Sequence, residues 1–314
     1  MKYLFHFLSS ICVLYACTPG PGNDTILPEV PEGVQAISLL GNELRASRAS
    51  EAILQNYDKA KNNFEAQPDN PDLLIWYGRW TAYKGDYREA IRIFTEGILA
   101  FPDDARMYRH RGHRYISIRC FDRAIKDFQT AEQMIIGKKD EVEPDGMPNA
   151  RNIPVSTLHT NIYYHLGLAY YLSHDLQKAL QVYQKGVAAS DNDDMLVAHI
   201  HWLYMTLQLL EKEDEAKQAL APIHTDMNVI ENVAYYQLCL MYKGLIDLED
   251  LTGDAMSDTM SDALKYGIGN WYLYHGGVEK AEETFSDILR GEAWSSFGYI
   301  AAETYLSSQL TGDF

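Results

Sequence analysis

The chain has 314 residues, of which 46% are hydrophobic and 23% are charged, a composition typical of an ordered globular protein. Its formal net charge is -17 at pH 7, so its surface repels the phosphate backbone that a nucleic-acid-binding protein must attract. No nucleic-acid partner is therefore predicted. The four cysteines form no CxxC or Cys/His spacing that would hold zinc. We expect Cys120 and Cys239, which lie far apart, to be separate buried thiols.

The amino terminus has the layout of a secretory signal peptide. Lys2 supplies one positive charge, and an apolar run follows over residues 3–16. This run is shorter than the roughly 20 apolar residues that a transmembrane helix needs. The sequence Leu14-Tyr15-Ala16-Cys17 resembles the lipobox of bacterial lipoproteins. The resemblance implies removal of residues 1–16 and lipidation of Cys17; ordinary secretion with cleavage elsewhere is the alternative.

Residues 17–34 are predicted to be the lipidated cysteine and a flexible tether, because prolines and glycines are frequent after position 18. Two or more acyl chains on Cys17 would hold the protein stably on a bilayer. Thr18 carries no acidic retention signal, which favours the outer membrane. The predicted location is therefore the bacterial cell envelope, lipid-anchored, on the periplasmic or the surface face.

A pattern of small and aromatic residues then recurs along the chain: a glycine, an alanine twelve residues later, and an aromatic residue four residues after that. Its four copies are Gly78, Ala90 and Phe94; Gly112, Ala124 and Phe128; Gly167, Ala179 and Tyr183; and Gly269, Ala281 and Phe285. Glycine inside a helix costs about 1 kcal/mol relative to alanine. Its recurrence at one phase therefore indicates a place where two helices cross closely.

This pattern resembles the tetratricopeptide repeat (TPR), a 34-residue motif of two antiparallel helices. The resemblance implies an all-α fold, a TPR-type α-solenoid in which antiparallel helix pairs stack into a right-handed superhelix over residues 35–314. Clear repeats are predicted near 71–104, 105–138, 160–193 and 262–291. Degenerate pairs are expected at 35–67, 195–226 and 229–260, a closing helix at 293–309, and no sheet.

The first helix of each TPR commonly lines a concave groove that holds a peptide, and the resemblance places eight side chains there. They are Arg79, Tyr83, Arg106, Arg109, His113, Asn161, Tyr164 and His201. Arg106, Arg109 and His113 share one helical stripe in an otherwise acidic chain. Such a stripe would suit the carboxylate of a peptide or protein partner. A solvated face or a set of internal ion pairs is the alternative.

An insertion separates the second and third clear repeats, because the glycine-to-glycine spacing rises from 34 residues to 55 (167 minus 112). The insert covers residues 137–157, and inserts in repeat proteins often lie on the binding face. We expect Asn149, Arg151 and Asn152 at the mouth of the groove. A spacer without a ligand is the alternative.

The sequence contains no HExxH, GxSxG, GxxxxGK[ST] or GxGxxG motif. We therefore predict a non-catalytic scaffold or adaptor that binds a protein or peptide partner, without a cofactor or metal. The fold-level resemblance favours binding but names no ligand. The alternative is an envelope enzyme or a glycan-processing accessory with an unrecognised site.

Overall fold

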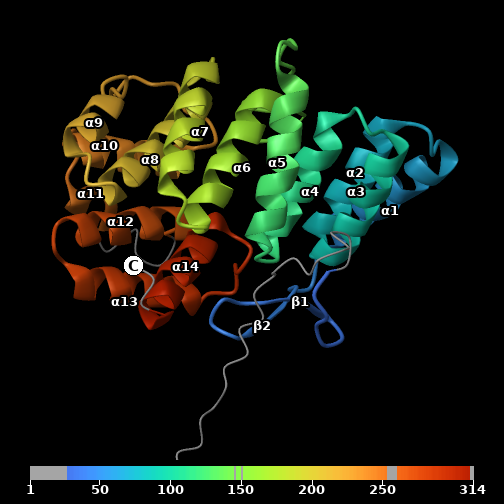
Figure 1. The fold of residues 1–314 in the computed structure, drawn as a ribbon, viewed down its shortest axis with the longest axis horizontal. Helices are drawn as coiled ribbons and strands as arrows, with labels where there is room; N and C mark the ends of the chain where they lie inside the picture. The colour runs from blue at the N-terminus through green and yellow to red at the C-terminus, as the bar shows by residue number, and fades with distance from the viewer. Residues whose placement is uncertain (1–26, 145, 150, 253–259, 312–314) are drawn as a thin grey trace, which may run out of the picture.

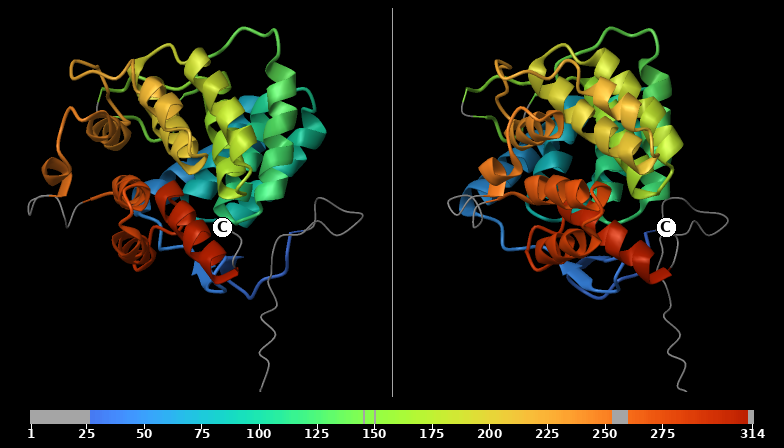
Figure 2. Two further views of the ribbon diagram at one scale, coloured as in Figure 1. Left: turned by 60° about the vertical axis from the view of Figure 1, so that its left-hand side comes forward. Right: turned by 90° about the vertical axis from the view of Figure 1, so that its left-hand side faces the viewer.

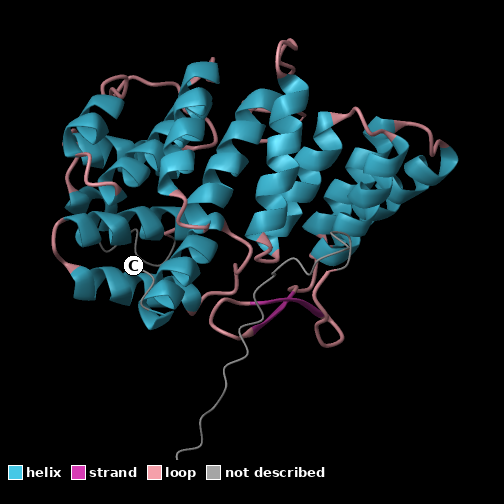
Figure 3. Ribbon diagram, viewed as in Figure 1, coloured by secondary structure: helices cyan, strands magenta, loops and turns pink. Residues whose placement is uncertain are grey.

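The computed structural model describes residues 27–144, 146–149, 151–252 and 260–311, and Figures 1 and 3 show its elements. The strands are β1 (Val34–Ile37) and β2 (Glu43–Arg45). The helices are α1 (Glu51–Ala66), α2 (Pro71–Tyr83), α3 (Tyr87–Ala100), α4 (Ala105–Ser117), α5 (Phe121–Ile135), α6 (Leu158–Leu172), α7 (Leu176–Ala189), α8 (Asp193–Leu209), α9 (Glu213–Ala219), α10 (Val233–Lys243), α11 (Leu248–Thr252), α12 (Asp262–Tyr274), α13 (Val278–Leu289) and α14 (Phe297–Thr311). None of the helices in the described ranges has the length and hydropathy needed to cross a bilayer.

Successive helices pack side by side as antiparallel pairs, and the pairs stack along the chain (Figure 1). The pairs α2 with α3, α4 with α5, α6 with α7 and α12 with α13 are extensively packed. The second helix of one pair also packs on the first helix of the next, as α5 does on α6. The fold is therefore an all-α, TPR-type solenoid.

In each of the four copies, the repeated glycine lies against the repeated aromatic ring. A Cβ atom placed on the glycine would come within 3 Å of that ring: 2.5 Å for Gly78 and Phe94, 2.9 Å for Gly112 and Phe128, 2.6 Å for Gly167 and Tyr183, and 2.4 Å for Gly269 and Phe285. The repeated alanines are fully buried. A larger residue at the glycine would push the two helices of a pair apart.

Side chains before the helices fix where several of them begin. Asn70, Asp104, Thr157 and Asn192 each accept a hydrogen bond from a backbone N–H in the first turn of the helix that follows. These N–H groups have no partner within the helix, so the caps satisfy them. The cap at Thr157 fixes the start of α6 directly after the insert.

The segment before α1 differs from the expected helix pair over 35–67. Only its second half is helical, as α1, and its first half is an antiparallel hairpin of β1 and β2, so the expectation of no sheet was wrong there. Gly41 turns the hairpin with φ +84°, a backbone conformation that favours glycine. Val34, Ala36 and Leu44 are buried. The hairpin therefore covers part of the hydrophobic core in place of the expected helix.

The last helix returns to the beginning of the chain. α14 packs on α12 and α13 and also touches α6, and it lies near the hairpin in the rotated views (Figure 2). Glu303 of α14 is 2.7 Å from Arg119, in the turn between α4 and α5, and it also accepts a 2.6 Å hydrogen bond from the backbone N–H of Leu39. Trp294 donates to the carbonyl of Arg45 at 2.7 Å. The segment before α1 and the last helix, the two ends of the described chain, are thus joined.

The cysteines follow the expectation in part. Cys239 is a free, fully buried thiol, so no bridge joins it to Cys120. Cys120 is disulfide-bonded, which corrects the expectation of a thiol there.

Candidate peptide-binding groove

The two arginines of the predicted stripe on α4 lie in different surroundings. Arg106 forms 2.6 Å ion pairs with Asp104 and Asp72, so its charge is compensated at the start of the helix. Arg109, about one helical turn further along α4, is 8% exposed and contacts Glu143 of the insert. The stripe predicted from the sequence therefore does not act as one surface: Arg106 is paired locally, and Arg109 alone reaches the buried centre.

A carboxylate from the insert already lies at that centre. The side chain of Glu143 is 7% exposed, and one of its oxygens, Oε2, lies 3.2 Å from Arg109 Nε and accepts a 2.9 Å hydrogen bond from Asn161 Nδ2. The other oxygen, Oε1, is 3.2 Å from Nε2 of His110. We call Arg109, His110 and Asn161 the carboxylate site; α4 supplies the first two residues and α6 supplies the third.

The protonation of the carboxylate site follows from its hydrogen bonds. Arg109 Nη1 lies 2.9 Å from His110 Nδ1, and because arginine can only donate, Nδ1 accepts and the proton of a neutral His110 is on Nε2, facing Glu143. Burial, followed by the charge of Arg109, holds the pKa of His110 well below its usual value. Burial also lowers the pKa of Arg109. The site therefore offers one guanidinium and two neutral donors to one carboxylate.

The fit between Glu143 and the site is incomplete. Arg109 Nε and Glu143 Oε1 are buried without a hydrogen bond that meets normal geometry, although both have a charged or polar neighbour at 3.2 Å. A close approach without alignment keeps the Coulomb attraction but loses much of the hydrogen bond. The carboxylate site thus holds Glu143 but leaves one hydrogen-bond donor of Arg109 and one acceptor of Glu143 poorly matched.

The base of the insert is fixed by short antiparallel pairing between its two ends. Glu143 N–H donates to the carbonyl of Ser156 at 2.9 Å, and Leu158 N–H donates to the carbonyl of Glu141 at 2.9 Å, on either side of an isolated bridge between Val142 and Thr157. This pairing directs the Glu143 side chain at the groove. The insert therefore occupies the groove as an extended segment.

Beyond Glu143 the insert runs along α2. Arg79 donates a 2.6 Å hydrogen bond to the carbonyl of Pro144, and Gly146 lies against the ring of Tyr83. The two predicted groove residues of α2 are therefore both in contact with the insert. A cavity of about 330 Å3 adjoins this point, and its lining residues are Asn56, Lys59, Ala60, Asn63, Leu73, Trp76, Trp80 and Gly146.

The far end of the insert contacts the segment before α10. Asn149 donates to Glu231, and Arg151 donates a 3.1 Å hydrogen bond to the side chain of Asn228. Asn152 is exposed, with φ +53°. These residues were expected at an open groove mouth; in the structure, Asn149 and Arg151 instead fasten the insert across it.

Other predicted groove residues lie in the interior. His113 stacks near His165 and Phe297 of α14, with ring centroids 4.4 Å and 5.3 Å away. Tyr164 is hydrogen-bonded to Tyr235 at 2.8 Å, and His201 is fully buried. The expectation of an open groove at these positions is therefore wrong: α10 and α14 cover them, because their own apolar faces are buried only by packing there.

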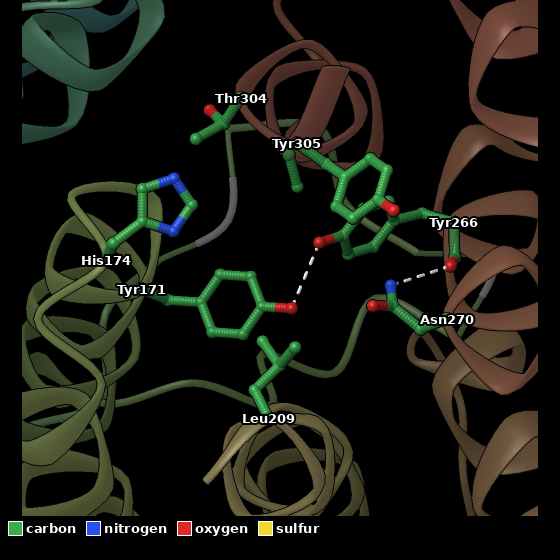
Figure 4. A pocket seen from close by; sticks show the side chains of 8 residues that line it. Tyr171, His174, Leu209, Tyr266, Asn270, Thr304 and Tyr305 are labelled. Carbon is green, nitrogen blue, oxygen red and sulfur yellow. Dashed lines mark hydrogen bonds between the residues drawn. The ribbon is translucent and has the colours of Figure 1, made fainter. Parts of the chain in front are cut away.

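A second, much smaller cavity lies between α6, α8, α12 and α14 (Figure 4). Its volume is about 10 Å3, the size of one water molecule, so it cannot hold an organic ligand. The hydroxyl groups of Tyr171 and Tyr266 are 3.0 Å apart across it, and Asn270 donates to the carbonyl of Tyr266 at 2.9 Å. Within the described part of the chain, no three His, Cys, Asp or Glu side chains are grouped to hold a metal ion.

Two residues of the site were missed by the sequence analysis, His110 and Glu143. His110 precedes the glycine by two positions and is off the predicted groove stripe. For Glu143 a signal existed: a groove predicted to bind a carboxylate adjoins an insert that contains Asp140, Glu141 and Glu143. An internal carboxylate is the nearest candidate for such a groove.

No family model and no curated protein sequence matches the chain. Among solved structures it is similar to YrrB, described as a TPR protein with an unusual peptide-binding site, with a TM-score of 0.42 and 15% identity over 81% of this chain and 98% of that one. It is similar to a tetratricopeptide repeat protein from Parabacteroides merdae, with a TM-score of 0.46 and 16% identity over 81% and 92%. For the TPR domain of P58(IPK) the TM-score is 0.24, with 11% identity over 84% and 94%. At these scores and identities, what those proteins bind is not evidence for what this chain binds.

Proposed function

We propose that this chain is a non-catalytic scaffold that binds an acidic segment of a protein or peptide partner in the groove of α2, α4 and α6. The observation that carries the proposal is the position of Glu143: a carboxylate on an extended segment lies in the groove, beside Arg109, His110 and Asn161. A buried guanidinium flanked by neutral donors is a binding site for a carboxylate. In the free protein, the insert supplies that carboxylate.

A partner would bind by taking the place of Glu143. The insert competes at an effective concentration that reaches the millimolar range for a short tether. The apparent affinity for a partner is reduced by the fraction of molecules in which the insert has left the site. Weakening the attachment of the insert should therefore strengthen the binding of a separate partner. If the helix face were only solvated and bound nothing, the same change would have no effect on binding.

The replacement Glu143→Gln tests the proposal, because it removes the internal charge while keeping the size of the side chain. The probe is a fluorescent nine-residue peptide copying residues 141–149, here called the insert peptide. We expect Glu143→Gln protein to bind it at least about tenfold more tightly than wild type does, measured by fluorescence anisotropy. A version of the peptide with Gln at its third position should bind about tenfold more weakly.

The matched control is Arg106→Gln on the same helix, because Arg106 is paired with Asp72 and Asp104 and does not contact Glu143. Adding it to Glu143→Gln should leave the affinity within about twofold, whereas adding Arg109→Gln should abolish the preference for Glu over Gln in the peptide. Equal binding of the Glu and Gln peptides to Glu143→Gln protein would contradict the proposal.

We also propose that Cys17, which lies outside the described residues, carries a lipid that anchors the scaffold in the bacterial cell envelope. The membrane proposed is the outer one, because Thr18 is not an acidic retention signal. Mass spectrometry of the amino-terminal peptide should give a cysteine bearing a diacylglycerol group, and Cys17→Ser should move the protein from the membrane to the soluble fraction. An unmodified Cys17 in mature protein from cells would refute the anchor and leave the groove proposal intact.

A further inference from the structure

We infer that the partner's binding segment is an extended chain with a glutamate at the position of Glu143 and a glycine three residues later, and that the insert is an internal copy of it. This inference rests on the proposed carboxylate-binding function and adds which partner sequences the groove accepts. Some contacts of the insert involve only its backbone and can be made by any sequence, whereas others depend on a particular side chain.

The backbone contacts are open to any extended segment. Glu143 N–H donates to Ser156, and the carbonyl of Glu141 accepts from Leu158, as in the addition of a strand to an exposed edge. The carbonyl of Pro144 accepts from Arg79 at 2.6 Å. These bonds hold an extended chain in place and set its direction, but they select no side chain.

The glutamate is the first position that the groove reads. Its oxygens are within 3.2 Å of Arg109 and His110 and within 2.9 Å of Asn161 Nδ2. A neutral residue here leaves the guanidinium of Arg109 buried without a counter-charge, and an uncompensated buried charge is strongly unfavourable. Selection at this position is therefore by charge.

The glycine is the second position. Gly146 is buried, and a Cβ atom on it would lie 2.3 Å from the hydroxyl oxygen of Tyr83 and 2.5 Å from its ring. Tyr83 has little room to move aside, because its hydroxyl accepts a hydrogen bond from Arg79 at 3.3 Å and its ring meets that of Trp80 edge to face at 5.2 Å. The groove therefore rejects any side chain three residues after the glutamate.

The test uses full-length Glu143→Gln protein and three peptides: the insert peptide, the same peptide with Gln at position three, and the same peptide with Ala at position six. We expect the Ala peptide to bind at least about tenfold more weakly than the insert peptide. In a Tyr83→Ala, Glu143→Gln background, the two peptides should bind within about twofold of each other. Asn63→Ala, in the adjoining cavity and away from Tyr83, should leave the discrimination unchanged.

The outcomes separate this inference from the proposed function. If the Glu peptide is preferred over the Gln peptide but the Ala peptide binds as well as the insert peptide, the glycine rule is overturned and the carboxylate site stands. If the Gln peptide binds as well as the insert peptide, the carboxylate site itself fails.

A measurement within the chain covers the case in which Glu143→Gln does not fold. In otherwise wild-type protein, Gly146→Ala should speed hydrogen exchange of the Glu143 amide, which is bonded to Ser156, by about tenfold or more. Adding Tyr83→Ala should restore slow exchange. Unchanged exchange in Gly146→Ala would overturn the requirement for glycine.

Discussion

Replacing Glu303 with glutamine should lower the free energy of unfolding by about 3–5 kcal/mol, the usual cost of removing one partner from a buried ion pair. The side chains of Arg119 and Glu303 are 3% and 1% exposed. Arg119 would keep its bonds to the carbonyls of Ser117 and Trp294 but would lose the negative charge of Glu303 beside it. Leu39 N–H would also lose a charged acceptor. Urea denaturation followed by circular dichroism measures the loss.

The control is Glu96→Gln. Glu96 pairs with Arg92 on the surface of α3, and both side chains are more than half exposed. Exposed pairs contribute about 0–1 kcal/mol, so this variant should change the unfolding free energy by less than about 1 kcal/mol. A loss at Glu303 no greater than that at Glu96 would show that the buried pair does not join the ends of the solenoid.

Lowering the pH from 7 to 5 should destabilise the protein by several kcal/mol. Five interior histidines, His110, His113, His165, His199 and His201, have pKa values lowered chiefly by burial, to about 4 for His199 and about 3 for His201. Below pH 6.5 the unfolded chain takes up protons that these rings exclude in the folded protein, so stability falls with pH; above 6.5 they contribute no slope. At pH 5 each of His199 and His201 lowers the free energy of unfolding by about 2 kcal/mol. The pH is then about 1.5 units below the histidine pKa of about 6.5 in the unfolded chain, and each unit is worth about 1.36 kcal/mol.

His201→Phe provides the control, because neither ring nitrogen of His201 has a hydrogen-bond partner among the described residues and the ring stacks on Tyr235 at 4.6 Å. A phenyl ring can take that place without losing a bond. The slope of unfolding free energy between pH 6 and 5, from urea titrations at each pH, should decrease by about 1.2 kcal/mol per pH unit, close to the value for one proton. A slope equal to that of wild type would show that His201 is not a buried neutral group.

The repeat architecture could be predicted because its cause is local and periodic. A glycine that must face an aromatic ring recurs at a fixed phase, as Gly78 faces Phe94, and one sequence carries that signal several times over. The β1–β2 hairpin lacked such a signal. Its buried residues number only a few, and Leu39 and Leu40 fall beside the turn, where Gly41 has positive φ.

The sequence predicted which faces of the helices carry the candidate site, but not which side chains contact one another there. Counting from the glycines placed Arg109 and Asn161 toward the inside, and the structure brings both to Glu143. The same counting could not show that Arg106 pairs with Asp72, because that choice depends on the packing of α4 against α2. Nor could it show that Phe297 would reach His113, since contacts across more than 180 residues leave no periodic trace.

The joined ends change how the stack can come apart. An open row of repeats can fray from either tip, because a terminal pair has a neighbour on one side only. Here Leu39 and Ser307 are hydrogen-bonded, and Trp294 donates to the carbonyl of Arg45, so α14 cannot detach without also uncovering the hairpin. Slow-exchanging amides should therefore occur in β1 and α14 together, and a protease cut that releases one should release both.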